Sequence, residues 1–216
     1  MSSPTAELVW ITPDAEEQIV HCARVSNPQS QKEGKSPERL IRYLIKHKHW
    51  SPFEMASMCV EINTTRDIAA QILRHRSFSF QEFSQRYSKV SVEASIPELR
   101  FQDNTNRQSS IQDVDGRLEL FKDRIAVSYG YAQSLYHDMI SAGVAKECAR
   151  KVLPLQTPTR LYMAGTIRSW IHYLQVRCGP ETQLEHRQVA FAAKALIDHH
   201  LPIIHDAVFL SEESYQ

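Results

Sequence analysis

The sequence predicts an α+β fold, in which residues 1–216 form a single domain with an antiparallel sheet flanked by helices, one of them long. Three observations favour this fold. Apolar residues recur at helical spacing along most of the chain, and only a few short segments have the apolar–polar alternation of strands. The chain has 216 residues, of which 42% are hydrophobic, so it can bury one substantial core. Its strands do not alternate regularly with helices, which argues against a doubly wound parallel sheet.

The first part of the chain is expected to hold two strands and three helices. Residues 8–12 read as a strand, and Asp14 is placed to cap the helix that follows. Residues 27–35 are polar and are expected to form a loop. Pro37 suits a helix start, and the next helix has its apolar stripe at positions 40, 41, 44 and 45 and ends at basic residues 47–49. Residues 56–62 alternate as a strand, and Thr64 or Thr65 can cap a helix that runs to residue 73.

The second part is expected to be mainly helical. Residues 91–116 are polar without a clear period and are expected to be a long loop. Residues 114–142 give the clearest helical pattern, with Gly143 as its stop. A short helix over residues 145–153 ends at Pro154. Two further helical stretches cover residues 165–176 and 181–207, and Pro202 should break or kink the second.

The composition limits the partners and the compartment. Lysine and arginine number 25, as do aspartate and glutamate, so the net charge gives no support for broad attraction to nucleic acid or membranes. No run of about 18 apolar residues indicates a membrane span, and the N-terminus lacks the pattern of a secretory signal. The four cysteines, Cys22, Cys59, Cys148 and Cys178, show no C-x-x-C spacing and are expected to be buried and reduced. A cytoplasmic location is therefore expected.

Residues 74–87, Arg-His-Arg-Ser-Phe-Ser-Phe-Gln-Glu-Phe-Ser-Gln-Arg-Tyr, are the most informative segment. Arginine side chains match phosphate and carboxylate oxygens in two-point contacts, serine hydroxyls can add to them, and Glu82 can accept from a ribose hydroxyl. The composition therefore suits a nucleotide. Two alternatives stay open on composition alone: a solvated basic face at a helix end, or a single-strand nucleic-acid surface in which aromatic residues interleave with cations.

A metal site near the C-terminus is a weaker hypothesis. His199, His200, His205 and Asp206 are candidate ligands, but adjacent histidines on a helix point to different faces and no H-E-x-x-H spacing occurs. We therefore expect no metal. The sequence also lacks G-x-G-x-x-G and Walker patterns, so no Rossmann-type cofactor site is expected.

The arginine-rich segment resembles the signature of flavin-dependent thymidylate synthases, R-H-R-x-x-S-x-x-x-x-S-x-R, at every fixed position. Further resemblance covers most of the chain. Residues 23–26 resemble the family's A-R-V-S, residues 49–54 its H-x-[ST]-P-F-E, and residues 152–155 its V-L-P-L, followed by T-R at 159–160. Gln71 precedes the signature by three residues, as in the family, and residues 183–187 resemble its A-Q-x-E-I-R.

This resemblance implies an activity. The family methylates dUMP to dTMP, with 5,10-methylenetetrahydrofolate as the carbon donor and with FAD, reduced by NADPH, as the source of hydride. It works as a homotetramer whose active sites lie between subunits, and it needs no enzyme cysteine as nucleophile. The alternatives are a single-strand-binding module and a flavoprotein with another electron acceptor.

The resemblance also implies the site residues. Arg187 would be catalytic, because a guanidinium facing uracil N3 and O2 stabilises the ionised ring and makes C5 more nucleophilic. On structural grounds alone, Arg187 would be an exposed arginine paired with Glu185 or Gln183. The flavin would contact Ser26, His49, Ser51, Glu54, Arg74, His75, Arg76, Ser77, Glu82, Gln175, Arg177 and Glu181. The nucleotide dUMP would contact Gln71, Arg74, Glu82, Phe83, Ser84, Gln85, Arg86, Arg160 and Arg187.

Three positions depart from the family pattern or lie in a connector. Gln175 stands where many relatives have asparagine, whereas Arg177 matches the family. Glu181 lies in a connector whose length can differ from that of relatives. His186 stands where the usual motif has isoleucine, which leaves Arg187 in place.

Overall fold

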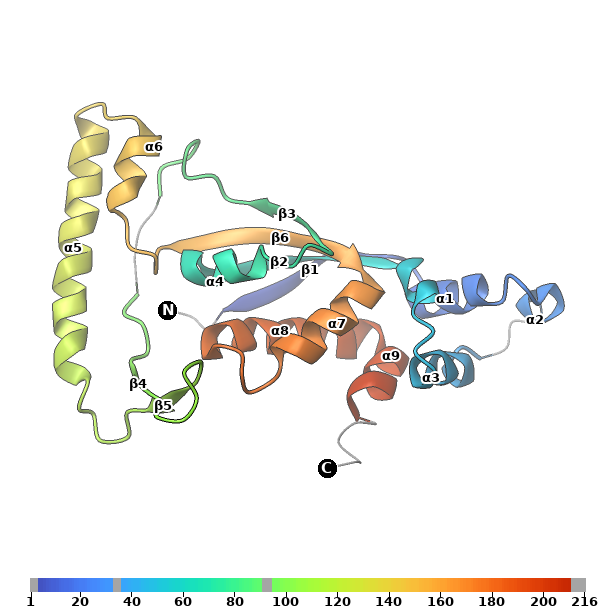
Figure 1. Ribbon diagram of the computed structural model, residues 1–216. Helices are drawn as coiled ribbons and strands as arrows, with labels where there is room; N and C mark the ends of the chain where they lie inside the picture. The colour runs from blue at the N-terminus through green and yellow to red at the C-terminus, as the bar shows by residue number, and fades with distance from the viewer. Residues whose placement is uncertain (1–3, 33–35, 91–94, 211–216) are drawn as a thin grey trace.

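The computed structural model describes residues 4–32, 36–90 and 95–210. A four-stranded antiparallel sheet lies at its centre, in the order β1-β2-β6-β3 (Figure 1). The strands are β1 (Thr5–Ile11), β2 (Ser57–Thr65), β6 (Pro158–Thr166) and β3 (Ser79–Glu82). β2 and β6 pair along their whole length, from Ser57 opposite Thr166 to Thr65 opposite Pro158. The α+β prediction with an antiparallel sheet flanked by helices is confirmed.

The sheet has one apolar and one polar face because side chains alternate along each strand. Met58, Val60 and Ile62 of β2 are fully buried, as are Leu161 and Met163 of β6. Most of the intervening positions are polar, with Cys59 and Ala164 as exceptions. The polar positions include Glu61 and Asn63 of β2 and Arg160 and Tyr162 of β6.

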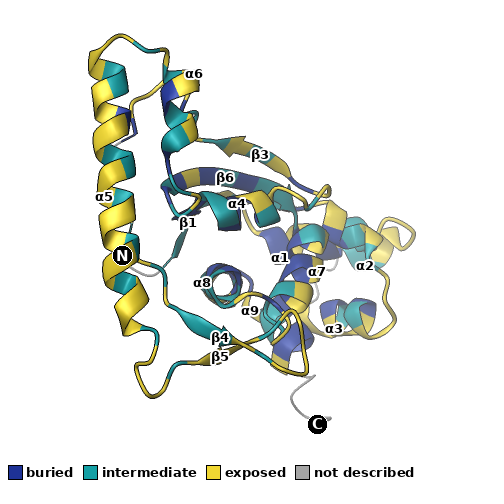
Figure 2. Cartoon of the chain, turned by 60° about the vertical axis from the view of Figure 1, so that its left-hand side comes forward, coloured by how far each residue is buried: buried dark blue, intermediate teal, exposed yellow. Residues whose placement is uncertain are grey.

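Helices cover the apolar face. α7 (Ile167–Arg177) and α8 (Leu184–His200) run along it, and α4 (Arg66–Ile72) contacts both α8 and the sheet (Figure 2). At one end of the sheet lie α1 (Ala15–Ala23), α2 (Pro28–Lys32), α3 (Glu38–Lys46), α9 (Pro202–His205) and the irregular turns η1 (Ser51–Glu54) and η3 (Asp206–Leu210). Trp170 and Tyr173 of α7 are the largest side chains of this core without solvent exposure.

The long helix α5 (Glu119–Ser141) stands beside the body with α6 (Lys146–Ala149) and η2 (Arg150–Val152) (Figure 1). Its C-terminal half packs in a small second cluster, where the hydroxyl of Tyr136 accepts a hydrogen bond from the Val90 amide at 3.1 Å. Much of its surface is exposed (Figure 2). Gly143 adopts φ 84° after the helix, so the expected glycine stop is confirmed.

Several boundaries differ from the sequence expectations. The long helix begins at Glu119 rather than at residue 114, because the Asp113 carboxylate accepts from the amides of Arg117 and Leu118 and holds a turn there. Residues 165–166 end β6 instead of starting a helix, since the Thr166 hydroxyl caps α7 by accepting from the Ser169 amide at 3.2 Å. Residues 181–183 precede α8 and are not helical.

Other elements were missed or placed only in part. The polar residues 27–35 contain the short helix α2, and residues 33–35 lie outside the described part. The expected loop over residues 91–116 contains the hairpin β4 (Arg100–Gln102) and β5 (Ser110–Gln112), and residues 91–94 are likewise outside it. The strands β3 and β6 were not predicted. Asp14 does precede α1, but its side chain makes no capping hydrogen bond and its backbone is left-handed, with φ 47°.

Glu16 is a buried carboxyl that ties α1 to the start of α9. Its side chain is 7% exposed, and its Oε1 accepts a hydrogen bond from the Ile204 amide at 2.8 Å. Burial raises the pKa of the Glu16 carboxyl above its ordinary value, although the hydrogen bonds from the Ile204 and Ile203 amides lower it. The protonated form is therefore favoured by folding.

We predict that Glu16→Gln becomes more stable relative to the wild type as pH rises. The stability that protonated Glu16 contributes is present below the ordinary carboxyl pKa and is lost as pH rises through the raised folded-state pKa, whereas glutamine does not titrate. Urea unfolding of both proteins from about pH 4 to pH 7.5 measures this difference. A wild-type advantage that grows with pH would show that folding favours the charged carboxylate.

Candidate active site

One aromatic side chain anchors the segment between α4 and β3. Phe78 is buried, and its ring meets Trp170 and Tyr173 edge-on at centroid distances of 5.0 and 5.9 Å. A Cβ atom on Gly165 of β6 would lie 2.5 Å from this ring, so glycine is needed for Phe78 to approach the strand. With Phe78 turned inward, the preceding residues face solvent. They are Arg74, Arg76 and Ser77.

A cavity of about 490 Å³, here called the η1–α7 cavity, opens beside this segment. Its walls come from η1, the turn before β3, and α7. An ion pair joins Arg168 to Glu54, and the Ser169 hydroxyl donates to the Ser77 carbonyl oxygen at 3.2 Å. The lining residues are Trp50, Glu54, Ser77, Arg168, Ser169, Ile171, His172 and Gln175. Three residues expected at the flavin are therefore brought together: Glu54, Ser77 and Gln175.

His75 and Arg177, two further flavin candidates, are in direct contact. Arg177 Nε donates to His75 Nε2 at 2.9 Å. Burial, the charge of Arg177 and that of His172 lower the pKa of His75 to about 4. His75 is consequently a neutral imidazole near pH 7, with its Nε2 lone pair turned to Arg177.

Behind this pair lies a buried polar cluster. His186 has no solvent exposure; its Nε2 lies 3.1 Å from the Tyr173 hydroxyl and its Nδ1 lies 3.2 Å from Gln71 Oε1. Burial, together with the charges of Arg177 and His75, lowers the pKa of His186 to about 3. The neutral His186 ring thus holds the side-chain oxygen of Gln71, a dUMP candidate.

Arg187 lies at the start of α8. It does not form the pair with Glu185 or Gln183 that its position in the helix suggested. Its Nη1 donates to the Pro180 carbonyl oxygen at 3.4 Å. Glu185 is instead bound by Arg100 of β4, whose Nη2 donates to both carboxylate oxygens at 2.7 and 3.0 Å. In the described part of the chain Arg187 makes no ion pair, so its charge is not neutralised by Glu185.

A larger cavity, of about 740 Å³ and here called the sheet-face cavity, lies where β2 ends and β6 begins. It contains two dUMP candidates, Phe83 and Arg160, with Glu185 from α8. The backbone joins the first two, since the Phe83 amide donates to the Arg160 carbonyl oxygen at 2.9 Å. Glu82, next to Phe83, accepts from the Thr159 hydroxyl at 2.9 Å. This sheet-face cavity is also lined by the buried Thr64, whose hydroxyl has no hydrogen-bond partner in the described part of the chain.

The remaining dUMP candidates lie beyond β3. Arg86 forms an exposed ion pair with Glu147 at 3.3 Å, beside α6. Ser84 accepts from the Arg86 amide at 3.4 Å. Gln85 is 3% exposed, and neither polar atom of its amide has a hydrogen-bond partner among the described residues. A buried amide without partners is costly, which is consistent with a position completed by a ligand or another chain.

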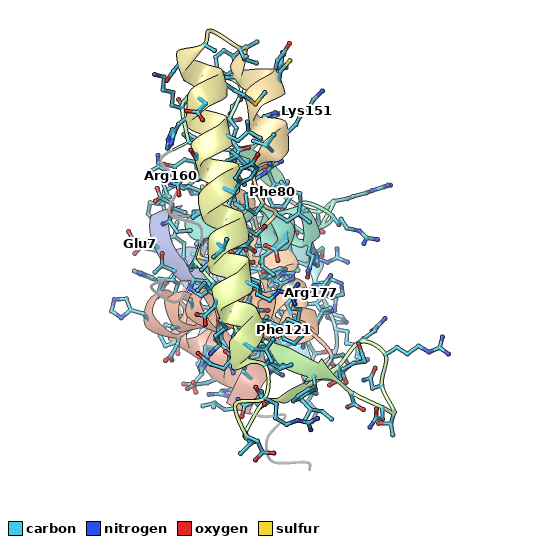
Figure 3. The ribbon with its side chains drawn as sticks, turned by 90° about the vertical axis from the view of Figure 1, so that its left-hand side faces the viewer. Glu7, Phe80, Phe121, Lys151, Arg160 and Arg177 are labelled. Atoms are coloured by element: carbon cyan, nitrogen blue, oxygen red, sulfur yellow. The ribbon has the colours of Figure 1, made fainter. Side chains whose placement is uncertain are left out.

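The candidates consequently fall into separate groups within one chain. Glu54, Ser77 and Gln175 surround the η1–α7 cavity, whereas Phe83 and Arg160 line the sheet-face cavity and Arg86 lies near α6. Arg160 and Arg177 are well separated when the molecule is viewed from the side of α5 (Figure 3). Six flavin candidates line neither cavity and are exposed: Ser26, His49, Ser51, Arg74, Arg76 and Glu181.

Comparison with known proteins decides the family. The family model described as "Thymidylate synthase complementing protein" matches residues 7–203. A flavin-dependent thymidylate synthase of a Synechocystis strain is 49% identical over 187 residues, covering 86% of each chain. A probable flavin-dependent thymidylate synthase of Paramecium bursaria Chlorella virus 1 is 47% identical over 195 residues, covering 90% of each. The chain belongs to the flavin-dependent thymidylate synthase family. It is therefore a methyltransferase.

A solved structure agrees with this assignment. The UMP/dUMP methylase PolB from Streptomyces cacaoi, bound with 5-Br dUMP, superimposes with a TM-score of 0.83 at 29% identity, covering 96% of this chain and 95% of that one. The fold of this chain is thus shared with that methylase along nearly its whole length.

Sequence reasoning missed some residues of the site. Arg168 and His172 line the η1–α7 cavity because α7 follows directly from β6, a strand that was not predicted. Arg100 binds Glu185 from a hairpin expected to be a loop. The sequence around an arginine gives no local signal of a distant partner. The Arg168–Glu54 and Arg100–Glu185 contacts each join segments more than 80 residues apart along the chain.

The remaining hypotheses can also be compared with the structure. Among the described residues no cluster of histidine, cysteine, aspartate and glutamate is arranged to hold a metal. The rings of His199 and His200, at adjacent positions of α8, are in contact with their centroids 4.5 Å apart, and His205 lies beside Asp198 and Asp206. The four cysteines are free, as expected, but Cys148 is exposed, and only Cys59 is fully buried. None of the described helices is both long and apolar enough to cross a membrane.

We predict that the ion pair between Arg100 and Glu185 stabilises the fold. The two side chains are only 12% and 23% exposed, so Arg100→Met should lower the free energy of unfolding by about 1–3 kcal/mol by leaving the carboxylate without its cation. Adding Glu185→Gln should recover part of that loss. Urea unfolding of the two single variants and the double variant measures the coupling. Additive losses would show that the pair contributes nothing.

Proposed function

We propose that this enzyme converts dUMP to dTMP, with 5,10-methylenetetrahydrofolate as carbon donor and NADPH as the reductant of bound FAD. Family membership supports the reaction, and PolB, a methylase of UMP and dUMP, was solved with 5-Br dUMP bound. Residues 1–216 would act as one catalytic domain. The observation that carries the proposal is Arg187: a cation at the head of α8 that Glu185 does not neutralise.

Arg187 would face the pyrimidine ring. Its guanidinium next to uracil N3 and O2 would favour the ionised ring, because an adjacent positive charge stabilises an anion. The added electron density would make C5 a better nucleophile toward the one-carbon unit. Arg100 contributes indirectly, since by holding Glu185 it keeps that carboxylate from weakening the field of Arg187.

Ser84, Arg86 and Arg160 would hold the phosphate and sugar, with Glu82, Phe83 and Gln85 beside them. The ion pair between Arg86 and Glu147 is well exposed, with side chains 63% and 56% accessible. Such pairs contribute only about 0–1 kcal/mol. A phosphate offers a planar guanidinium stronger two-point contacts, so Arg86 would exchange Glu147 for the nucleotide at little cost.

The η1–α7 cavity fits part of a flavin. Hydrogen-bonding groups of Glu54, Ser77 and Gln175 converge there, and such convergent polar groups in a concave site are typical of cofactor binding. Arg74 and Arg76, which are exposed and precede Ser77 in the chain, would bind phosphates, and His75 with Arg177 would present a fixed acceptor and cation. Ser26, His49, Ser51, Glu82 and Glu181 would complete the site. When bound, FAD supplies the hydride chemistry.

We further propose that the enzyme is a homotetramer with sites shared between subunits. The separate positions of the candidates in one chain support sharing. Arg86 lies beside Glu147, whereas Arg187 lies at the start of α8, and neither arginine lines the η1–α7 cavity or the sheet-face cavity. Residues 82–86 and Arg160 of one chain would meet Gln71, Arg74 and Arg187 of another. No cysteine would act as nucleophile.

The first test is tritium release from C5-labelled dUMP. Methylation replaces the hydrogen at C5, so release should require methylenetetrahydrofolate and NADPH, and UMP assayed in parallel would define the sugar preference. Arg187→Lys should lose most of its rate and dUMP affinity, because lysine lacks the two-point fork. Arg42→Lys, at an exposed helix-face ion pair with Glu38, is the matched control and should remain active.

If the flavin-loaded protein releases no tritium, or releases it without methylenetetrahydrofolate, the proposed reaction is rejected. Near-normal turnover by Arg187→Lys would reject the role of Arg187 alone.

Shared sites can be tested by mixing inactive variants. Arg86→Ala and Arg187→Ala should each be nearly inactive, and subunits dissociated and reassembled together should regain activity, because some sites would receive both arginines from different chains. Differently tagged chains verify that exchange has occurred. If exchange is complete and activity stays at the level of the single variants, both arginines come from the same chain.

A further inference from the structure

Five polar side chains near the start of α8 form a continuous hydrogen-bonded chain. It starts at the Tyr173 hydroxyl, 3.1 Å from His186 Nε2, and passes from His186 Nδ1 to Gln71 Oε1 at 3.2 Å. Gln71 Nε2 then donates to Gln183 Oε1 at 2.6 Å, and Gln183 Nε2 to Glu185 Oε2 at 3.0 Å. It draws together α4, α7 and α8.

The hydrogen bonds of this chain all run in one direction. Gln71 Oε1 can only accept, so His186 Nδ1 must carry the proton and donate it. In a neutral imidazole the other nitrogen then holds a lone pair, and the Tyr173 hydroxyl donates to it. The lowered pKa of His186, about 3, is consistent with this neutral form, and burial raises the pKa of Tyr173, so the hydroxyl keeps its proton.

Both ends of the chain are fixed. Tyr173 is fully buried among Trp170, Phe78 and His75, and Glu185 is bound at the other end by Arg100. Turning the Gln71 amide over would place its NH₂ against the His186 N–H and its oxygen against Gln183 Oε1. Two hydrogen bonds would become two repulsive contacts, so one orientation of this amide is strongly favoured.

We propose that His186 and Tyr173 are positioning residues for the nucleotide, which hold the Gln71 amide with its oxygen inward and its NH₂ presented as a donor. This rests on the proposed function, in which Gln71 contacts dUMP. A Gln71 fixed in this way binds a hydrogen-bond acceptor of dUMP, a ring carbonyl or a phosphate oxygen, without first reorienting. Pre-organisation of this kind increases affinity by lowering the ordering cost of binding.

The test is a double-mutant cycle with Tyr173→Phe and Gln71→Ala. Phenylalanine keeps the buried ring but removes the hydroxyl, so His186 can change tautomer and no longer holds the Gln71 oxygen, which leaves Gln183 as the one contact of this chain that orients the amide. The dissociation constant for dUMP, measured by calorimetry on the flavin-loaded enzyme, should rise about tenfold in the Gln71 background and less than twofold in the Gln71→Ala background. KM for dUMP should rise by a similar factor, with kcat changed much less.

Packing damage would give a different pattern. It would lower affinity equally in both backgrounds, and that result, or an unchanged dissociation constant for Tyr173→Phe, overturns the inference. His186→Phe, which keeps a buried ring, repeats the cycle if Tyr173→Phe does not fold. A wild-type enzyme that fails to bind dUMP rejects the proposed function itself, whereas wild-type binding without coupling rejects only the role of His186 and Tyr173.

Discussion

The packing of Phe78 against Gly165 is the contact on which the rest of the site depends. It lets β3 lie beside β6, with Ser79 opposite Ala164 and Glu82 opposite Leu161. The ring occupies space that any side chain at position 165 would fill. With Phe78 buried against α7, the residues before it are held at the surface over the η1–α7 cavity, and those after it run along the edge of the sheet toward the second cavity. One aromatic anchor thus divides the arginine-rich signature between two places.

Burial determines which members of the signature are charged. Arg74, Arg76 and Arg86 are exposed and keep their hydration until an anion replaces it. His75 and His186 are more buried, and burial together with the charge of Arg177 lowers the pKa of each far below neutrality. Neutral imidazoles have fixed donor and acceptor sides, so they can orient the groups they contact without adding repulsion to a site already rich in cations.

The candidate site could be predicted from sequence only where the residues lie close together along the chain. The signature supplies residues 74–86 at fixed spacing, and the structure gathers Glu54, Ser77 and Gln175 around one cavity. The sequence did not reveal which distant residues contact the candidate site residues. Arg168 meets Glu54, Arg100 meets Glu185, and His186 meets Gln71, each pair separated by 85 or more residues. Such contacts are set by how the sheet and helices pack, which no local pattern encodes.

The sequence by itself determined the α+β class, most of the helices, the family and the identity of the signature residues. Local hydrophobic periodicity and fixed motif spacing are enough for these. Only the tertiary structure decided the sheet order, the strand β6, the hairpin in the expected loop and the separation of Arg86 from Arg187 within one chain. Residues 158–166 mix polar and apolar side chains with a glycine and read as no clear element alone. They become a central strand because β2 and β3 satisfy their backbone hydrogen bonds from both sides, and those partners lie about a hundred residues away along the chain.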